Sequence, residues 1–163
     1  MIVVADASPL IFLAKLRRLG LLSQLLGHDI RVPRAVRDEV LRAGIDPAED
    51  AVLKAFLKDC RIETVRRPRQ FAAAMSRADN QALTLAVRAQ ADLILCDERG
   101  LRIMAETEGI RPLGTLGIVI RAVRRKLIAS PDARQLVDTL IRSHGFRIGV
   151  EVYQAVLKEL ERL

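Results

Sequence analysis

Short apolar runs alternate with segments of helical spacing along most of the chain. Five runs have the length of buried strands, and they cover residues 2–5, 30–32, 62–65, 93–96 and 111–113. Between them, apolar residues recur every three or four positions, as in amphipathic helices that pack on a core. Strands that alternate with helices predict an α/β fold with a central, mostly parallel sheet.

The helical segments have recognisable starts and ends. We expect helices over residues 10–19, 21–26, 33–42, 46–59, 76–89, 100–108, 114–126, 130–142 and 150–162. Ser8-Pro9 and Ser130-Pro131 each fit a helix cap with proline in the first turn, and Ser76 fits a third cap. Ala43-Gly44 fits the end of the helix that Pro33 opens.

The length of 163 residues favours one domain, and no linker or internal repeat interrupts it. From about residue 114 the chain is mainly helical. We therefore predict a single domain over 1–163, in which 114–163 is a helical C-terminal extension.

Acidic residues fall where a parallel sheet would bring them together. Asp6 and Asp97 each follow an apolar strand, at the edge where open parallel sheets form ligand sites. On their predicted helices, Glu39 lies beside the apolar stripe and Asp79 lies on it. Four carboxylates at one edge would repel one another unless cations balance them. Their hard oxygen atoms suit Mg²⁺ or Mn²⁺, which can activate water and neutralise charge on a phosphodiester.

Each acid also has a purely structural interpretation. Asp6 can cap the helix that follows it. Glu39 can form a surface salt bridge with Arg42, three residues later on the same helix. Ser76 and Asp79 have the spacing of a capping box. Taken singly, these alternatives stay open, and the constellation is more informative than any member.

The excess of basic residues favours a polyanionic binding partner. Lys and Arg number 27 against 20 Asp and Glu, which gives a net charge of +7 and favours RNA or DNA. With four Phe, one Tyr and no Trp, base stacking on aromatic platforms is excluded as the main binding mode. Basic clusters lie at 66–69 and 121–126, where each arginine is either a solvated charge, an RNA contact or a contact to an acidic protein.

Other classes fit poorly. Cys60 and Cys96, with only two histidines, make no zinc pattern, and Cys96 is expected to be a buried reduced thiol. No G-x-G-x-x-G follows a strand, and Asp6-Ala7-Ser8 lacks the second Asp of an aspartyl-phosphate enzyme. Without a secretory signal or a membrane-length apolar run, we expect a cytoplasmic protein that does not bind membranes.

Several segments together resemble PIN-domain proteins. They are Val3–Ile11, Val32-Pro33 with Glu39 in the following helix, Ala78–Leu83, Ala91–Arg99, Gly114–Ile118 and the turn Gly145–Ile148. The opening Asp6-Ala7-Ser8-Pro9 and the Gly114–Ile118 segment are similar to a VapC-like subgroup of that superfamily. The resemblance covers essentially the whole chain and implies a three-layer α/β/α architecture.

The resemblance also implies a function. It indicates an Mg²⁺- or Mn²⁺-dependent ribonuclease, often the toxin of a toxin–antitoxin pair, with RNA as substrate, an antitoxin protein as partner and a possible homodimer. The acidic residues of the family correspond to Asp6, Glu39, Asp79 and Asp97, which would bind the metal, and Ser8 would support the first Asp. The candidate contacts to RNA or a partner are Arg66, Arg67, Arg69 and Arg99.

This chain departs from the subgroup pattern at two places. Where relatives often read Gly-Glu-Ala-Glu, it reads Ala78-Asp79-Asn80-Gln81, and the helix projection points Gln81 away from the site. After Asp97, Glu98 is the candidate for a further family acid, although a solvated charge is the simpler interpretation. These departures support an alternative, a catalytically degenerate PIN-like module that acts through a protein or RNA partner.

Overall fold

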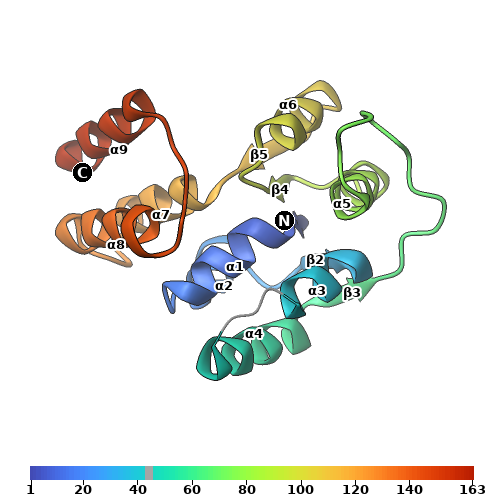
Figure 1. The fold of residues 1–163 in the computed structure, drawn as a ribbon, viewed down its shortest axis with the longest axis horizontal. Helices are drawn as coiled ribbons and strands as arrows, with labels where there is room; N and C mark the ends of the chain where they lie inside the picture. Colours follow the sequence, from blue (N-terminus) through green and yellow to red (C-terminus); the bar gives the residue numbers. More distant parts are fainter. Residues whose placement is uncertain (43–45) are drawn as a thin grey trace. The chain divides into compact units, whose positions relative to one another are not determined.

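The computed structural model describes residues 1–42 and 46–163. Strands and helices alternate as the apolar pattern predicts, and they form two compact units, Met1–Thr115 and Leu116–Leu163 (Figure 1). The elements are β1 (Val3–Ala5), α1 (Ala7–Lys15), α2 (Gly20–Leu26), β2 (Ile30–Pro33), α3 (Arg34–Leu41), α4 (Pro47–Asp59), β3 (Arg61–Glu63), α5 (Arg77–Arg88), β4 (Leu93–Leu95), α6 (Arg99–Thr107), β5 (Arg111–Leu113), α7 (Thr115–Arg124), α8 (Ser130–Ser143) and α9 (Val150–Arg162).

The first unit is built on a parallel sheet with strand order β3-β2-β1-β4-β5. In register, Val3 of β1 lies opposite both Ile30 of β2 and Leu93 of β4. The chain therefore runs outward from β1 to β3, returns to β4 beside β1, and continues outward to β5. This reversal makes the β1/β4 boundary a topological switch point, where the carboxyl ends of neighbouring strands leave a crevice.

The strands at the switch point are the most buried part of the sheet. Every residue of β1 and β4 is buried, which explains their unbroken apolar sequence, since helices cover parallel sheets on both faces. Helix α5 contacts β1, β2 and β4, and α3 contacts both β2 and α5. The predicted α/β/α architecture is thus confirmed, and α3 and α5 are held together above the sheet.

The second unit consists of three helices with a core of their own. Its buried side chains are Val119, Val123, Ala133, Val137, Val156 and Leu160. Three polar contacts join its helices: the Tyr153 hydroxyl donates to Asp138 Oδ1 at 2.7 Å, Ser130 Oγ donates to the Leu160 carbonyl oxygen, and Arg124 pairs with Glu159. The helical character expected from about residue 114 is therefore observed, while its union with the first unit in one domain stays a prediction.

Two predicted helix caps are wrong. Helix α1 begins at Ala7 with Asp6 in the N-cap position, so Ser8 and Pro9 both lie in its first turn. Helix α8 begins at Ser130, with Ala129 as N-cap. In both cases proline is where a first turn tolerates it, and the serine lies inside the helix. The predicted stop at 43–44 lies outside the described residues.

The third predicted cap is confirmed as a complete capping box. Ser76 Oγ accepts a hydrogen bond from the Asp79 N–H at 3.1 Å, and Asp79 Oδ2 accepts one from the Ser76 N–H at 3.1 Å. These bonds satisfy two of the backbone donors that a helix start leaves without partners. They also fix the direction in which the Asp79 carboxylate leaves α5.

Both cysteines are free, and Cys96 is buried after β4. Burial, followed by the charge of Asp6, raises the pKa of the Cys96 thiol to about 12. The expected buried, reduced thiol is therefore confirmed, and it is neutral at physiological pH. Among the described residues, no helix has both the length and the apolar character that crossing a membrane requires.

Replacing Ser76 by alanine tests the capping box. We expect Ser76→Ala to lower the free energy of unfolding by about 1 kcal/mol, because the Asp79 N–H loses its acceptor. Urea unfolding followed by circular dichroism measures this change. Ser23→Ala in α2 is the control, since the Ser23 side chain makes no hydrogen bond with residues 1–42 or 46–163. Equal stability of the two variants would contradict the assignment of the cap.

Candidate active site

The predicted acids lie around the carboxyl ends of β1, β2 and β4, all within the Met1–Thr115 unit. Asp6 directly follows β1, and its N–H donates to the Leu95 carbonyl oxygen at 2.9 Å. Asp97 comes two residues after the end of β4. These two acids therefore flank the switch point. Glu39 belongs to α3, which follows β2, and Asp79 belongs to the first turn of α5.

Asp6 is the buried member of the group. Its side chain is 4% exposed, and Oδ1 is a buried oxygen without a hydrogen-bond partner among the described residues. The pKa of Asp6 is raised to about 7, first by burial and then by the charge of Asp79, with smaller contributions from Glu39 and Asp97. The Ala7 N–H acts in the opposite direction. All four carboxylates therefore interact electrostatically, as expected if they share one edge.

Asp6 has the position of a helix cap but not the hydrogen bond of one. Asp6 occupies the N-cap position of α1, but its side chain makes no capping hydrogen bond to the first turn. A cap would have satisfied a carboxylate oxygen with a backbone N–H. The unpartnered Oδ1 is thus left for another ligand.

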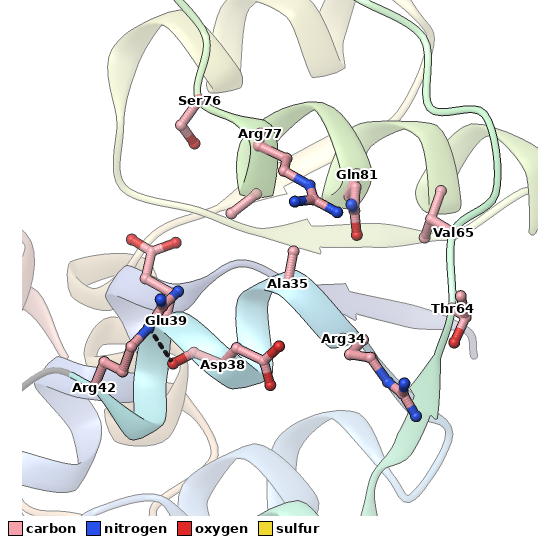
Figure 2. Close-up of a pocket in the computed structure, with 11 residues that line it drawn as sticks. Arg34, Ala35, Asp38, Glu39, Arg42, Thr64, Val65, Ser76, Arg77 and Gln81 are labelled. Carbon is pink, nitrogen blue, oxygen red and sulfur yellow. Dashed lines mark hydrogen bonds between the residues drawn. The ribbon is translucent and has the colours of Figure 1, made fainter.

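Glu39 on α3 and Asp79 on α5 repel each other electrostatically. Desolvation and the charge of Asp79 raise the pKa of Glu39, whereas Arg42 lowers it. The salt bridge considered for Glu39 is not formed, because Arg42 Nε donates instead to the Asp38 carbonyl oxygen at 3.2 Å (Figure 2). Asp79 keeps its capping bond while it influences both Asp6 and Glu39. Its structural and electrostatic interpretations therefore hold together.

Asp97 is held by donors on both oxygens. Thr115 donates its N–H to Oδ1 and its Oγ1–H to Oδ2, each at 2.7 Å. Ser8 Oγ donates to Oδ2 at 3.2 Å. The expectation that Ser8 supports Asp6 is therefore wrong: the first turn of α1 directs this hydroxyl across the switch point to Asp97. These three hydrogen bonds fix the orientation of the Asp97 carboxylate.

Thr115 and Gly114 were not predicted as site residues. Thr115 is fully buried, and a Cβ on Gly114 would lie 2.8 Å from Asp97 Oδ1. Glycine is therefore required for the backbone to approach the carboxylate this closely. Gly114-Thr115 contributed to the family resemblance, but a hydroxyl residue at a helix start is usually interpreted as a cap. Only the packing of β5 beside β4 shows its second role.

The carboxylate oxygens suit a divalent cation that keeps several of its waters better than one coordinated by protein side chains alone. Within the described residues, no group of three or more His, Cys, Asp or Glu side chains is arranged to hold a metal ion. Mg²⁺ usually keeps several waters and binds through one or two carboxylates. A buried, unpartnered Asp6 oxygen among mutually repelling carboxylates has the chemistry for that mode of binding.

A pocket of about 520 Å³ adjoins these carboxylates between α3 and α5 (Figure 2). It is lined by Arg34, Ala35, Asp38, Glu39, Arg42, Thr64, Val65, Ser76, Arg77, Ala78 and Gln81. The expectation that Gln81 points away from the site is wrong: Gln81 is only 6% exposed and lines this pocket together with Glu39 of the facing helix. Asp38 also lines the pocket.

The four arginines predicted to contact RNA or a partner differ in whether their side chains already interact within the protein. Arg69 pairs through both terminal nitrogens with Glu108, at 3.1 and 3.2 Å, and lies 4.4 Å from the centre of the Phe71 ring. Arg66 and Arg67 have exposed side chains, and Arg99 is exposed at the start of α6. Arg69 thus has a structural role, and the role of all four in binding RNA or a partner stays a prediction.

Glu98 is exposed, as expected of a solvated charge, and it also has a structural role. Its Oε2 accepts a hydrogen bond from the Leu101 N–H at 2.7 Å and caps α6. The additional acid of the family pattern is therefore used here to start a helix.

The fold and the acids define an α/β protein with carboxylates at a topological switch point. A family model described as a PIN domain matches residues 2–162, so the chain belongs to the PIN-domain family. PIN domains are generally nucleases, and this chain has their nuclease-type fold. No curated protein matches the sequence.

One solved structure supports the same fold. It is a PilT N-terminus domain protein from the hyperthermophilic archaeon Sulfolobus solfataricus P2, with 14% sequence identity and a TM-score of 0.53. The match covers 72% of this chain and 90% of that chain. At this identity the similarity concerns the fold alone.

Neutralising Asp6 tests the repulsion among the acids. The pKa of Asp6 in the folded protein, about 7, lies above its ordinary value of 3.8, so the ionised carboxylate destabilises the metal-free protein above pH 7. We expect Asp6→Asn to raise the melting temperature by about 5 °C at pH 8. This gain shrinks as the pH falls from 7 towards 4, where Asp6 is protonated in the folded state. Thermal unfolding in EDTA measures it.

Asp59→Asn is the matched control, because Asp59 is an exposed acid at the end of α4. It should show no comparable dependence on pH. A marked loss of stability in Asp6→Asn at pH 8 would instead show that the carboxylate supports the start of α1.

Two substitutions at Thr115 test the support of Asp97. Thr115→Val keeps the shape but removes the hydroxyl donor, and we expect it to lower the free energy of unfolding by about 2 kcal/mol. Thr115→Ser keeps the donor and should cost about 1 kcal/mol for the lost methyl group. Urea unfolding of both proteins measures the difference. A valine variant more stable than the serine variant would refute the role of the hydroxyl.

Proposed function

We propose that this protein is a metal-dependent endoribonuclease that hydrolyses RNA phosphodiesters at Asp6, Glu39, Asp79 and Asp97. The observation that supports this most directly is the buried Asp6 carboxylate, with one unpartnered oxygen in the field of three other acids. A folded protein tolerates such a group when a cation offsets the repulsion. Membership of the PIN-domain family supports a nuclease over other uses of that cation.

In this proposal the side chains have separate tasks. Asp6 and Asp97 bind Mg²⁺ or Mn²⁺, while Glu39 and Asp79 contribute directly or through water. Thr115 and Ser8 keep Asp97 oriented, because their hydroxyl groups donate to its Oδ2. When bound, the cation supplies Lewis-acid stabilisation of charge on the phosphodiester. Burial of Asp6 keeps bulk water away from the centre of the group.

The biological setting that we propose follows from the family likeness. The opening Asp6-Ala7-Ser8-Pro9 is similar to VapC-like proteins, which makes this chain a candidate toxin of a toxin–antitoxin pair. Its partners would then be RNA, a cognate antitoxin protein and a second copy of the chain. The net charge of +7 favours attraction to the RNA backbone.

A catalytically degenerate PIN-like module is the second candidate. It is favoured by the absence, among the described residues, of any group of His, Cys, Asp or Glu already arranged for a metal ion. In this alternative the protein would act by binding RNA or a protein, and the acids would serve as caps and surface charges.

Metal binding followed by cleavage distinguishes the two candidates. We expect calorimetric titration of Mn²⁺ to show binding to the wild type and a loss of at least about tenfold in affinity in Asp97→Asn. Asp59→Asn should bind like the wild type. Mn²⁺ should then support cleavage of a labelled RNA by the wild type but not by Asp97→Asn. No binding by a well-folded wild type would favour the degenerate module.

A further inference from the structure

The pocket between α3 and α5 shares Glu39 with the proposed active site. Glu39 lines it and also acts electrostatically on Asp6 and Asp79. Thr64 and Val65, which line its other side, directly follow β3. The pocket therefore lies beside the carboxyl ends of β2 and β3, with Glu39 as the residue that it shares with the proposed site.

Arginines make part of this pocket attractive to anions. Arg34 and Arg77 are exposed, and neither side chain makes a hydrogen bond or ion pair with any described residue. Within the described residues, the Arg42 side chain donates to the Asp38 carbonyl oxygen. Asp38 pairs with Arg37 at 2.7 Å and interacts at longer range with Arg42 and Arg34. Arg34 and Arg77 are thus available for a phosphate.

Gln81 supplies a different kind of recognition. It is 6% exposed, yet its side-chain amide makes no hydrogen bond within the described part of the chain. Figure 2 shows it directed from α5 towards Ala35 of α3, across the pocket. Its amide nitrogen and oxygen are accessible from the pocket, since neither is a buried atom without a partner, and an amide offers both donors and an acceptor. The amide can therefore hydrogen bond with complementary groups of a ligand in the pocket.

We propose that this pocket binds one nucleotide of the single-stranded RNA substrate, next to the phosphodiester that is cleaved. This inference rests on the proposed ribonuclease function. Arg77 and Arg34 bind the phosphates that flank the nucleotide, and the Gln81 amide hydrogen bonds to the edge of its base. Proteins commonly recognise unstacked RNA bases through such edge contacts, and guanidinium planes replace aromatic rings where these are scarce.

The lining favours a nucleotide over an acidic peptide. Asp38 and Glu39 would repel a chain of carboxylates, whereas a nucleobase is uncharged and can donate amino hydrogens to them. The volume of about 520 Å³ lies in the range of small-ligand pockets. The exposed Arg34 and Arg77 thus suit the phosphates of a nucleotide, and the carboxylates and Gln81 suit its uncharged base.

The phosphate contact is tested by binding without cleavage. Fluorescence anisotropy in EDTA, with a labelled mixed-sequence 12-nucleotide RNA, measures affinity at several salt concentrations. We expect Arg77→Ala to weaken binding and to reduce the slope of log affinity against log salt by about one. Arg111→Ala removes the same charge from the opposite edge, because Arg111 begins β5, and should leave the affinity within about twofold.

The base contact is tested with Gln81→Leu, a substitution of similar size. We expect the wild type to distinguish rA12, rC12 and rU12 by about five- to tenfold in affinity. Gln81→Leu should reduce these differences, whereas Arg77→Ala should weaken all three RNAs equally. Circular dichroism establishes that each variant is folded. If Gln81→Leu does not fold, Ala35→Leu from the facing helix blocks the same pocket and should have the same effect on discrimination.

The outcomes separate this inference from the function on which it rests. If Mn²⁺-dependent cleavage occurs and needs Asp97, but Arg77→Ala and Gln81→Leu bind RNA like the wild type, the nucleotide pocket is refuted alone. If the wild type neither binds nor cleaves RNA, both proposals fail. If an oligoglutamate peptide binds in an Arg77-dependent manner and RNA does not, the pocket is a peptide site and the inference is overturned.

Discussion

The repulsion among carboxylates at one edge of the sheet is the constraint around which the first unit is organised. Parallel pairing of β1 with β4 places Asp6 and Asp97 on either side of the switch point, and burial then removes Asp6 from the water that would screen it. The fold opposes this cost in different ways for different members. Asp97 receives three hydrogen bonds, Asp79 binds a helix start, and Asp6 retains an oxygen with no partner. Asp6, the most buried of the four acids, is thus the one that keeps an oxygen without a hydrogen-bond partner.

Much of this arrangement could be predicted because it follows from local pattern. Apolar runs marked all five strands, and periodic spacing marked the helices to within a few residues, since both depend on which neighbours a short segment buries. Acids directly after buried strands were sufficient to locate the edge of interest. The errors at Ser8 and Ser130 came from serine followed by proline, a pattern that fits a helix start in more than one register.

The remaining features depend on contacts between distant segments. Thr115 reaches Asp97 only because β5 pairs with β4, and Ser8 reaches it only because α1 starts beside the end of β4. A projection of α5 alone separates Gln81 from Asp79, but it contains no information about α3, which closes the space around Gln81. Helical periodicity identifies the face a residue occupies and is silent on which element covers that face.

Asp79 has two roles, and this affects how the results of mutagenesis at that position are interpreted. One carboxylate oxygen holds the Ser76 N–H at the start of α5, while the charge acts on Asp6 and Glu39. A mutational scan that scores survival or loss of phenotype would merge these two requirements into a single apparent intolerance. Asparagine can keep the acceptor and lose the charge, whereas glutamate can keep both at a longer reach. The pattern of tolerated residues at this position, rather than its tolerance overall, therefore carries the information about which requirement selection maintains.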